Sequence, residues 1–163
     1  MNPDKKSKNK IKVGDKAPNF ILTSHSGDMV SLRDFLGSKH VVLFFYPKDN
    51  SPGCTAEACG FRDNYEEFNR IGAEVIGISS DHTESHERFS SSNRLPFKLL
   101  SDDGGIIIKL YRVPKTLGLI PGRVTYVIDK NGIIRHIFSS QFSPRKHVEE
   151  ALQALKSIWD KEG

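Results

Sequence analysis

Two cysteines, Cys54 and Cys59, are the residues of this 163-residue chain that point most directly to chemistry. They are the only cysteines in the sequence, and they lie five positions apart. Small secreted domains that depend on a disulfide framework use four or more cysteines. The pair therefore indicates thiol chemistry in a reducing compartment and not a structural scaffold.

Cys54 lies where a strand is followed by a helix. Residues 40–46 form an apolar run typical of a strand buried on both faces, and Pro47 ends it. Ser51 can cap a helix, and Pro52 suits the first helical position because the N–H that proline lacks would have no partner there. Cys54 then falls in the first helical turn, where free N–H groups and the helix dipole favour thiolate over thiol. These features favour a reactive cysteine over the alternative, a small buried hydrophobic residue.

Cys59 belongs to the same predicted helix. Five residues of an unbroken α-helix rise about 7.5 Å and turn through about 140°. A disulfide needs Cα atoms about 4.4 to 6.8 Å apart. The two sulfurs therefore cannot bond while the helix is intact, and a redox cycle that uses both must unwind its first turns.

Apolar spacing and turn residues predict alternating strands and helices. Strands are expected at residues 19–23, 29–32, 40–46, 74–79, 97–100, 124–128 and 133–138. Helices are expected at residues 32–36, 54–70, 83–92, 105–113 and 144–161, the last with Val148, Ala151, Leu152, Leu155, Ile158 and Trp159 on one face. A strand–helix–strand unit implies parallel pairing, and the turn at 129–132 predicts a hairpin. We therefore expect an α/β fold of thioredoxin-like architecture, with a mixed central sheet flanked by helices.

The net charge of +4 is confined to one end of the chain. Residues 1–12 carry five lysines and one acid, so the rest of the chain holds 19 basic and 19 acidic residues. We expect residues 1–11 to be a disordered basic tail and residues 12–163 to form a single domain. A charge-balanced domain gives no reason to expect a nucleic-acid partner. The sequence has no apolar run long enough to span a membrane and no apolar signal segment, so no membrane partner is expected.

Several segments together resemble a known family. Pro47, Ser51 and Cys54 share the spacing of the peroxiredoxin active-site motif. Cys54 and Cys59 within PGCTAEACGFRD resemble the peroxiredoxin Q, or bacterioferritin comigratory protein, subfamily. Further matches lie at residues 14–20, 75–79, 99–102 and 122–129, so the resemblance spans about residues 12–158.

This resemblance implies a thiol peroxidase that reduces hydrogen peroxide and organic hydroperoxides. Cys54 would be the peroxidatic residue that becomes a sulfenic acid, and Cys59 the resolving residue that forms an intramolecular disulfide with it. Arg123 would stabilise the thiolate and hydrogen-bond the peroxide. Ser51 would hydrogen-bond the peroxide oxygens, and Pro47 would shield the thiolate from water. The family more often has threonine in place of Ser51; serine keeps the hydroxyl but lacks the methyl that restricts its rotamer.

The resemblance also implies how the protein works in the cell. The reductant would be thioredoxin or a related dithiol, the role antioxidant defence and redox homeostasis, and the protein a monomer with no haem, flavin or metal cofactor. A cytoplasmic location is expected, with the plastid stroma or lumen as the alternative for a processed plant-type protein. Two other functions stay open. A thiol-disulfide oxidoreductase would favour Cys-x-x-Cys on the helix, and a non-enzymatic redox-sensing module would not need multiple turnover.

Three further polar residues have ordinary interpretations. His82 and His86 are four positions apart, but with the two cysteines they fit zinc-ligand spacing poorly, so we expect them on a polar helix face. Glu57, one helical turn after Cys54, is expected to be a solvated acid near a helix N-terminus.

Overall fold

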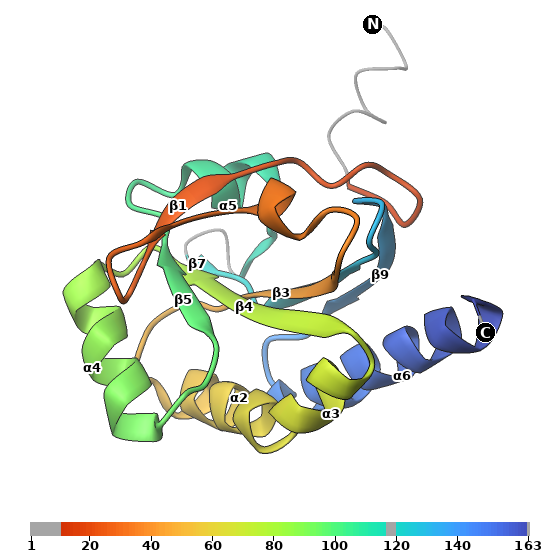
Figure 1. The fold of residues 1–163 in the computed structure, drawn as a ribbon. Helices are drawn as coiled ribbons and strands as arrows, with labels where there is room; N and C mark the ends of the chain where they lie inside the picture. Colours follow the sequence, from red (N-terminus) through yellow and green to blue (C-terminus); the bar gives the residue numbers. More distant parts are fainter. Residues whose placement is uncertain (1–10, 117–119, 163) are drawn as a thin grey trace, which may run out of the picture.

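A seven-stranded mixed sheet forms the centre of the computed structural model, which describes residues 11–116 and 120–162 (Figure 1). In sheet order its strands are β2 (Met29–Ser31), β1 (Ile21–Ser24), β5 (Lys98–Ser101), β4 (Ala73–Ser79), β3 (His40–Phe45), β8 (Val124–Ile128) and β9 (Ile134–Ser139). β3, β4 and β5 pair in parallel, and the other pairings are antiparallel. The expected mixed sheet and the β8–β9 hairpin are confirmed. A ribbon of β6 (Lys115–Thr116) and β7 (Ile120–Pro121), which the sequence did not predict, lies outside this sheet.

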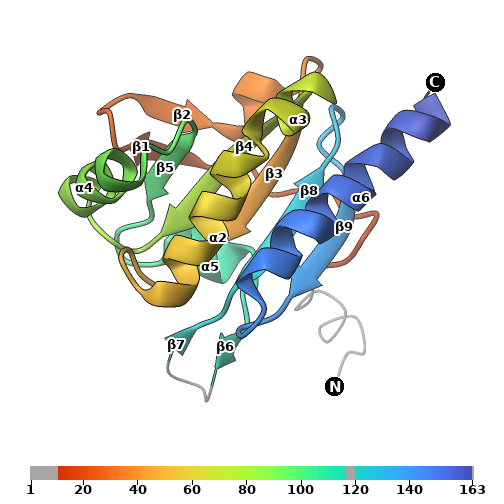
Figure 2. The same ribbon diagram turned by 90° about the horizontal axis from the view of Figure 1, so that it is seen from below.

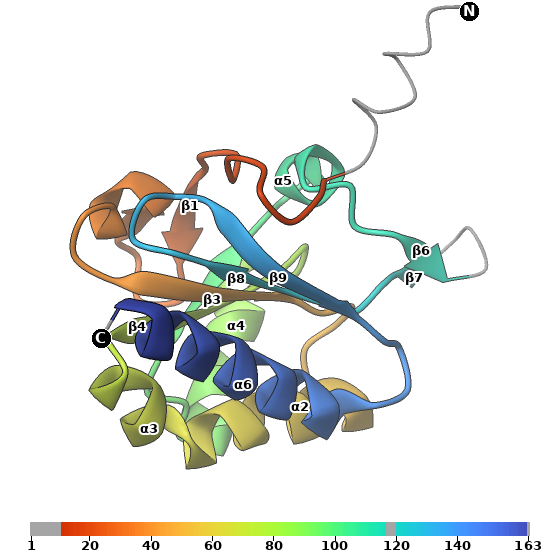
Figure 3. The same cartoon turned by 90° about the vertical axis from the view of Figure 1, so that its right-hand side faces the viewer.

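Helices cover both faces of the sheet. They are the 3₁₀ turn η1 (Leu32–Phe35) and the α-helices α2 (Pro52–Asp63), α3 (Tyr65–Arg70), α4 (Thr83–Asn93), α5 (Ile106–Leu110) and α6 (Pro144–Glu162). α2, α3 and α6 lie on one face and α5 on the other (Figure 3). α2 and α6 lie side by side (Figure 2).

The position of β3 at the centre of the sheet explains why its sequence is apolar without alternation. Its residues are buried on both sides of the sheet. Val41, Leu43 and Phe45 belong to the core beneath α5. Val42 and Phe44 belong to the core beneath α2, α3 and α6, which also contains the side chain of Cys54. Cys54 is therefore packed against the strand that leads to it.

The helix expected at residues 54–70 is two helices. Asn64 separates them with backbone angles φ −111° and ψ 11°. Its side-chain amide donates to the carbonyl of Gly60 at 2.8 Å. A side chain thus bonds one of the last carbonyl groups of α2 and competes with the backbone bonds that would continue the helix. The break lets Phe61 of α2 and Phe68 of α3 both reach the core. The helix expected at 105–113 is also shorter, because α5 ends at Leu110.

Trp159 was wrongly placed on the apolar face of α6. Its side chain is 56% exposed, whereas the neighbouring Ile158 is buried. Adjacent helical residues point about 100° apart, so both cannot face the sheet.

Residues 1–10, most of the expected basic tail, lie outside the described residues. Ile11 is half-buried against the core beneath α5. Within the described ranges, no helix combines the length and apolarity needed to cross a membrane.

Candidate active site

The start of α2 positions Cys54 in the way its sequence indicates. Ser51 is the N-cap, and its Oγ accepts from the backbone N–H of Cys54 at 3.4 Å. The same hydroxyl donates to the carbonyl of Lys48 at 3.1 Å. Pro52 is the first helical residue, and the Cys54 side chain is only 1% exposed. The predicted cap is confirmed, and it places a buried sulfur in the first helical turn.

Arg123 approaches the start of α2 from the strand next to β3 in the sheet. It directly precedes β8, whose first residue Val124 pairs with Phe45 at the end of β3. Its guanidinium is 4% exposed, and its Nε donates to the carbonyl of Gln141 at 3.3 Å. A Cβ atom on Gly53 would lie 2.8 Å from the Arg123 Nη2, so the guanidinium lies against the first turn of α2, close enough for its charge to interact with the Cys54 side chain. A permanent positive charge therefore lies beside the sulfur.

Glu57 is buried, and the expectation of a solvated acid is wrong. It is 0% exposed, and its Oε1 accepts from Arg123 Nη1 at 2.9 Å. Complete burial raises the pKa of Glu57 to about 8, although the charge and hydrogen bond of Arg123 act in the opposite direction. The sequence spacing could have indicated this burial, because a residue three positions after Cys54 lies on the same helix face as Cys54.

His147 lies behind this pair, and no sequence motif pointed to it. Its Nε2 is 2.8 Å from the carbonyl oxygen of Ser140 and therefore donates to it. Nδ1 is left to accept from the Thr125 hydroxyl at 2.8 Å, and it lies 3.4 Å from the Glu57 Oε2. Burial lowers the pKa of His147 to about 4, so the ring is neutral near pH 7. The Arg123–Glu57 pair therefore rests against a neutral histidine.

Cys59 lies away from Arg123. Its half-buried thiol is 3.7 Å from the Oδ1 of Asn93 on α4, and Cys59 also lines a groove of about 410 Å³ between α2 and α6. Both cysteines are free thiols, and α2 is unbroken between them. Pro47 is half-buried at the start of the loop before α2. The structure thus brings Ser51, Cys54 and Arg123 together and keeps Cys59 apart from them.

Comparison with known proteins identifies the family. Residues 13–137 match the model of the AhpC/TSA family. A chloroplastic peroxiredoxin Q from Oryza sativa subsp. japonica is 51% identical over 150 residues, which cover 91% of this chain and 69% of that protein. The chain belongs to the peroxiredoxins, in the peroxiredoxin Q subfamily. This peroxiredoxin is therefore a thiol peroxidase, and its two cysteines fit a mechanism with an intramolecular disulfide.

Solved structures agree with this peroxiredoxin in fold. The crystal structure of peroxidoxin BcpB from Mycobacterium tuberculosis is 37% identical, with a TM-score of 0.84, and the match covers 91% of this chain and 98% of that one. A bacterioferritin comigratory protein from Xanthomonas campestris, whose description concerns alkyl peroxide reduction, is 28% identical, with a TM-score of 0.79. That match covers 86% of this chain and 92% of the relative. The expected thioredoxin-like fold is confirmed.

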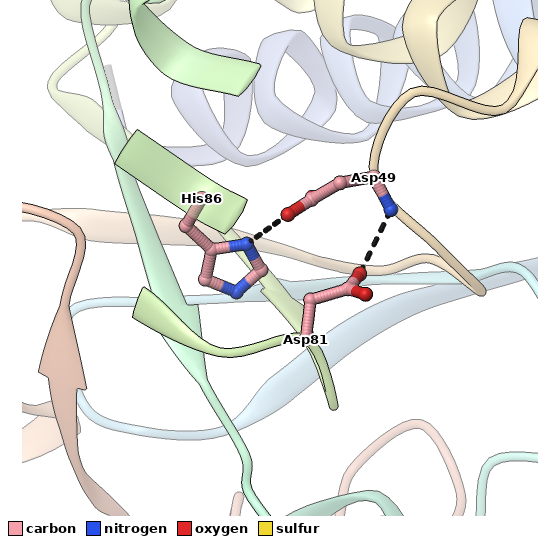
Figure 4. A group of neighbouring side chains, drawn as sticks. All are labelled: Asp49, Asp81 and His86. Atoms are coloured by element: carbon pink, nitrogen blue, oxygen red, sulfur yellow. Dashed lines mark hydrogen bonds and ion pairs between the residues drawn. The ribbon is translucent and has the colours of Figure 1, made fainter. Parts of the chain in front are cut away.

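The two histidines near α4 differ from the expectation that both lie on a polar helix face. His82 precedes the first residue of α4, and its side chain is 73% exposed. His86 is completely buried, because it faces the core side of α4 and bonds the loop before α2. In this peroxiredoxin the buried Asp49 of that loop and the buried His86 form a cluster with the half-buried Asp81 (Figure 4).

Replacing Gly53 with alanine should slow the reaction with peroxide without unfolding the protein. The new methyl group would meet the Arg123 guanidinium at 2.8 Å, so this group must shift from the position in which it bonds Glu57 and the Gln141 carbonyl. Alanine favours a helix over glycine by about 1 kcal/mol, which offsets part of the cost of shifting the guanidinium, so the variant should stay folded. A misplaced guanidinium should lower the rate roughly tenfold to a hundredfold. Stopped-flow measurement checks this, with Gly60→Ala in the same helix as control; an unchanged rate in Gly53→Ala would contradict the placement of Arg123.

The buried carboxyl of Glu57 should make stability depend on pH. The folded protein keeps this proton up to about pH 8, whereas the unfolded chain loses it near 4.5, so the folded state binds more protons in between. Stability should therefore fall as pH rises through this window, by up to about 1.4 kcal/mol per pH unit. Glu57→Gln removes this contribution. The free energy of unfolding of the variant, measured with denaturant, should therefore rise relative to that of the wild type from pH 5 to pH 8. A constant difference between the two proteins across this range would contradict the raised pKa.

Proposed function

We propose that this protein reduces hydrogen peroxide and organic hydroperoxides with Cys54 as the peroxidatic thiolate and Cys59 as the resolving thiol. The observation that carries the proposal is the buried Cys54, in the first turn of α2, beside the guanidinium of Arg123. In the first step the Cys54 sulfur attacks the terminal peroxide oxygen, and the O–O bond breaks. The leaving oxygen takes a proton and departs as water or an alcohol, leaving a sulfenic acid on Cys54.

In the second step the Cys59 sulfur attacks the Cys54 sulfur. The S–O bond breaks, water leaves, and a disulfide forms between the two residues. This step needs the first turns of α2 to unwind, because the helical separation exceeds the reach of a disulfide. A dithiol reductant then supplies two electrons and two protons and restores both thiols.

Three neighbours support the first step. Arg123 donates hydrogen bonds toward charge that develops on the peroxide oxygens, in a site shielded from water. Ser51 has a hydroxyl that can rotate from the Lys48 carbonyl toward a bound peroxide. Pro47, half-buried at the start of the loop before α2, is proposed to shield the thiolate from water. The alkyl peroxide reduction named for the Xanthomonas relative supports organic hydroperoxides as substrates.

Membership of the peroxiredoxin Q subfamily implies peroxide substrates and a thioredoxin-type reductant. Beyond that, we propose a single domain from residue 12, a monomer, and no nucleic-acid or membrane partner. The plant relatives described as chloroplastic support the plastid alternative over the cytoplasm. Peroxide consumption coupled to a thioredoxin system tests the function. Neither alternative, a thiol-disulfide oxidoreductase or a non-enzymatic redox-sensing module, would sustain multiple turnover of peroxide.

Replacing Cys59 with serine should stop the cycle after its first step. The variant should consume one equivalent of peroxide per protein, because Cys54 and Arg123 are untouched, and then stall as sulfenic acid or overoxidise. Peroxide consumption and the mass of the Cys54 peptide measure both outcomes. Sustained turnover with thioredoxin alone would mean that Cys59 is not the resolving residue.

A further inference from the structure

Asp49 fastens the loop between β3 and α2 to neighbouring elements. Its Oδ1 accepts from the hydroxyl of Tyr46 at 2.6 Å, and its Oδ2 accepts from the hydroxyl of Ser85 on α4 at 2.8 Å. Its backbone N–H donates to the Oδ2 of Asp81, after β4, at 2.8 Å (Figure 4). One buried residue therefore joins the active-site loop to two other parts of the fold.

His86 is a further partner of Asp49. We call the hydrogen bonds that Asp49 makes with Tyr46, Asp81, Ser85 and His86 the anchor. Its Nε2 lies 3.0 Å from the carbonyl oxygen of Leu100, and a carbonyl only accepts, so Nε2 carries a hydrogen. Its Nδ1 lies 2.7 Å from the Oδ2 of Asp49, and a carboxylate also only accepts. A second proton must lie between these two atoms. His86 and Asp49 are therefore joined by a buried, charge-assisted hydrogen bond, the stronger kind in proteins.

The cluster has the residue types of a metal site but not its hydrogen-bonding pattern. Asp49, Asp81 and His86 offer ligand atoms within 4.8 Å of one another. The Oδ2 of Asp81 accepts from the Asp49 N–H and from the Ser79 hydroxyl. The Oδ2 of Asp49 accepts from Ser85 and faces His86. A cation placed between these oxygens would meet N–H and O–H hydrogens, so the cluster is better described as a hydrogen-bonded anchor.

The segment just beyond the anchor is held differently. The hydroxyls of Ser51 and Thr55 and the N–H of Cys54 bond partners three or four positions away in the chain. The bonds of Asp49 to Asp81, Ser85 and His86 instead join residues 32 to 37 positions apart. Unwinding residues 51–55 breaks short-range bonds, and the first long-range side-chain bond along α2 is that of Glu57 to Arg123. Moving Asp49 would instead break its three long-range bonds to Asp81, Ser85 and His86 at once.

We propose that Asp49, held by His86, is a positioning residue that keeps the loop at 46–51 fixed while the first turns of α2 unwind. The anchor thereby sets the balance between the helical form that reacts with peroxide and the unwound form in which Cys59 reaches Cys54. This chemical consequence rests on the proposed function. A weaker anchor shifts the population toward the unwound form. Sulfenic acid then forms more slowly, and it is captured as disulfide before a second peroxide oxidises it to sulfinic acid.

Asp49→Asn tests the anchor, because it places an amide donor where the carboxylate accepts. We expect sulfenic acid formation to slow roughly tenfold or more, since the groups around the sulfur lose their alignment. The ratio of sulfinic acid to disulfide should fall, and amide hydrogen exchange across residues 52–59 should speed up in the reduced protein. Quenched-flow mass spectrometry and exchange measurements give these readouts.

Asp129→Asn is the matched control. Asp129 is also buried, accepts from the backbone N–H groups of Asn131 and Ile133, and pairs with Arg135. It lies in the turn between β8 and β9, where the next residue, Lys130, donates its backbone N–H to His40 at the other end of β3. This variant should lose stability without changing the product ratio or the exchange of residues 52–59.

A pair of substitutions at His86 separates positioning from mere destabilisation. Asparagine keeps an N–H donor near the place of Nδ1, so His86→Asn should restore much of the peroxide rate that His86→Leu loses. The proposal is overturned if Asp49→Asn matches Asp129→Asn in product ratio and exchange, or if His86→Asn is no better than His86→Leu. A wild type that forms neither sulfenic acid nor disulfide would instead refute the proposed function, and the exchange comparison would still decide whether Asp49 is the anchor.

Discussion

Replacing Cys54 with serine should abolish peroxide consumption. Cys54 is the sulfur that lies in the first turn of α2 beside Arg123, whereas Cys59 lies on the side of α2 that faces Asn93. A serine hydroxyl does not ionise near neutral pH and cannot replace the thiolate as the attacking group. Consumption of hydrogen peroxide coupled to a thioredoxin system should fall to the background without protein.

The fold gives this variant a clear control. Serine is close in size to cysteine, so circular dichroism and the denaturant midpoint should show a folded protein, and Cys59 should still react with a thiol reagent. Activity retained in folded Cys54→Ser would identify a different nucleophile and overturn the assignment of Cys54.

Replacing Arg123 with methionine should produce the next largest loss. The guanidinium is the cation beside the Cys54 sulfur, and its position is fixed by Glu57 and the Gln141 carbonyl. Removing a preorganised donor that stabilises developing charge typically costs about 10² to 10³ in rate. The second-order rate of the reduced protein with peroxide should fall by about that factor. Glu57 should stay protonated without its cation, so that the variant folds.

Two further variants define how Arg123 acts. Arg123→Lys keeps the charge but loses the planar fork, so its rate should lie between those of wild type and Arg123→Met. Glu57→Gln keeps the guanidinium and a side chain of the same shape, so it should lose much less. A rate for Arg123→Met close to that of wild type would exclude Arg123 from the reaction.

The parts of the structure that follow from local signals could be predicted from the sequence. The apolar run before Pro47 gave β3, the Ser51–Pro52 pair gave the start of α2, and the turn at 129–132 gave the hairpin. Each signal lies within a few residues of the element that it specifies. The position of Cys54 in its helix could therefore be predicted before any tertiary contact was known.

The surroundings of Cys54 could not be predicted in the same way. Glu57 accepts a hydrogen bond from Arg123, which lies 66 positions away, and His147 comes from a third element. His86 is likewise held by Asp49 across the fold. Such contacts leave no periodic pattern in the sequence, which therefore predicts a solvated Glu57 and a His86 on a polar helix face and gives no signal for His147. The burial of these titratable side chains depends on partners that are distant in the sequence.

The most direct test of the central claim is the mass of one peptide. Trypsin releases residues 49–62, which contain both Cys54 and Cys59. After one equivalent of peroxide, and without reductant, this peptide should have lost two hydrogens while the protein stays monomeric. A peptide that instead gains oxygen with no disulfide, or that is linked to a second chain, would contradict the intramolecular cycle.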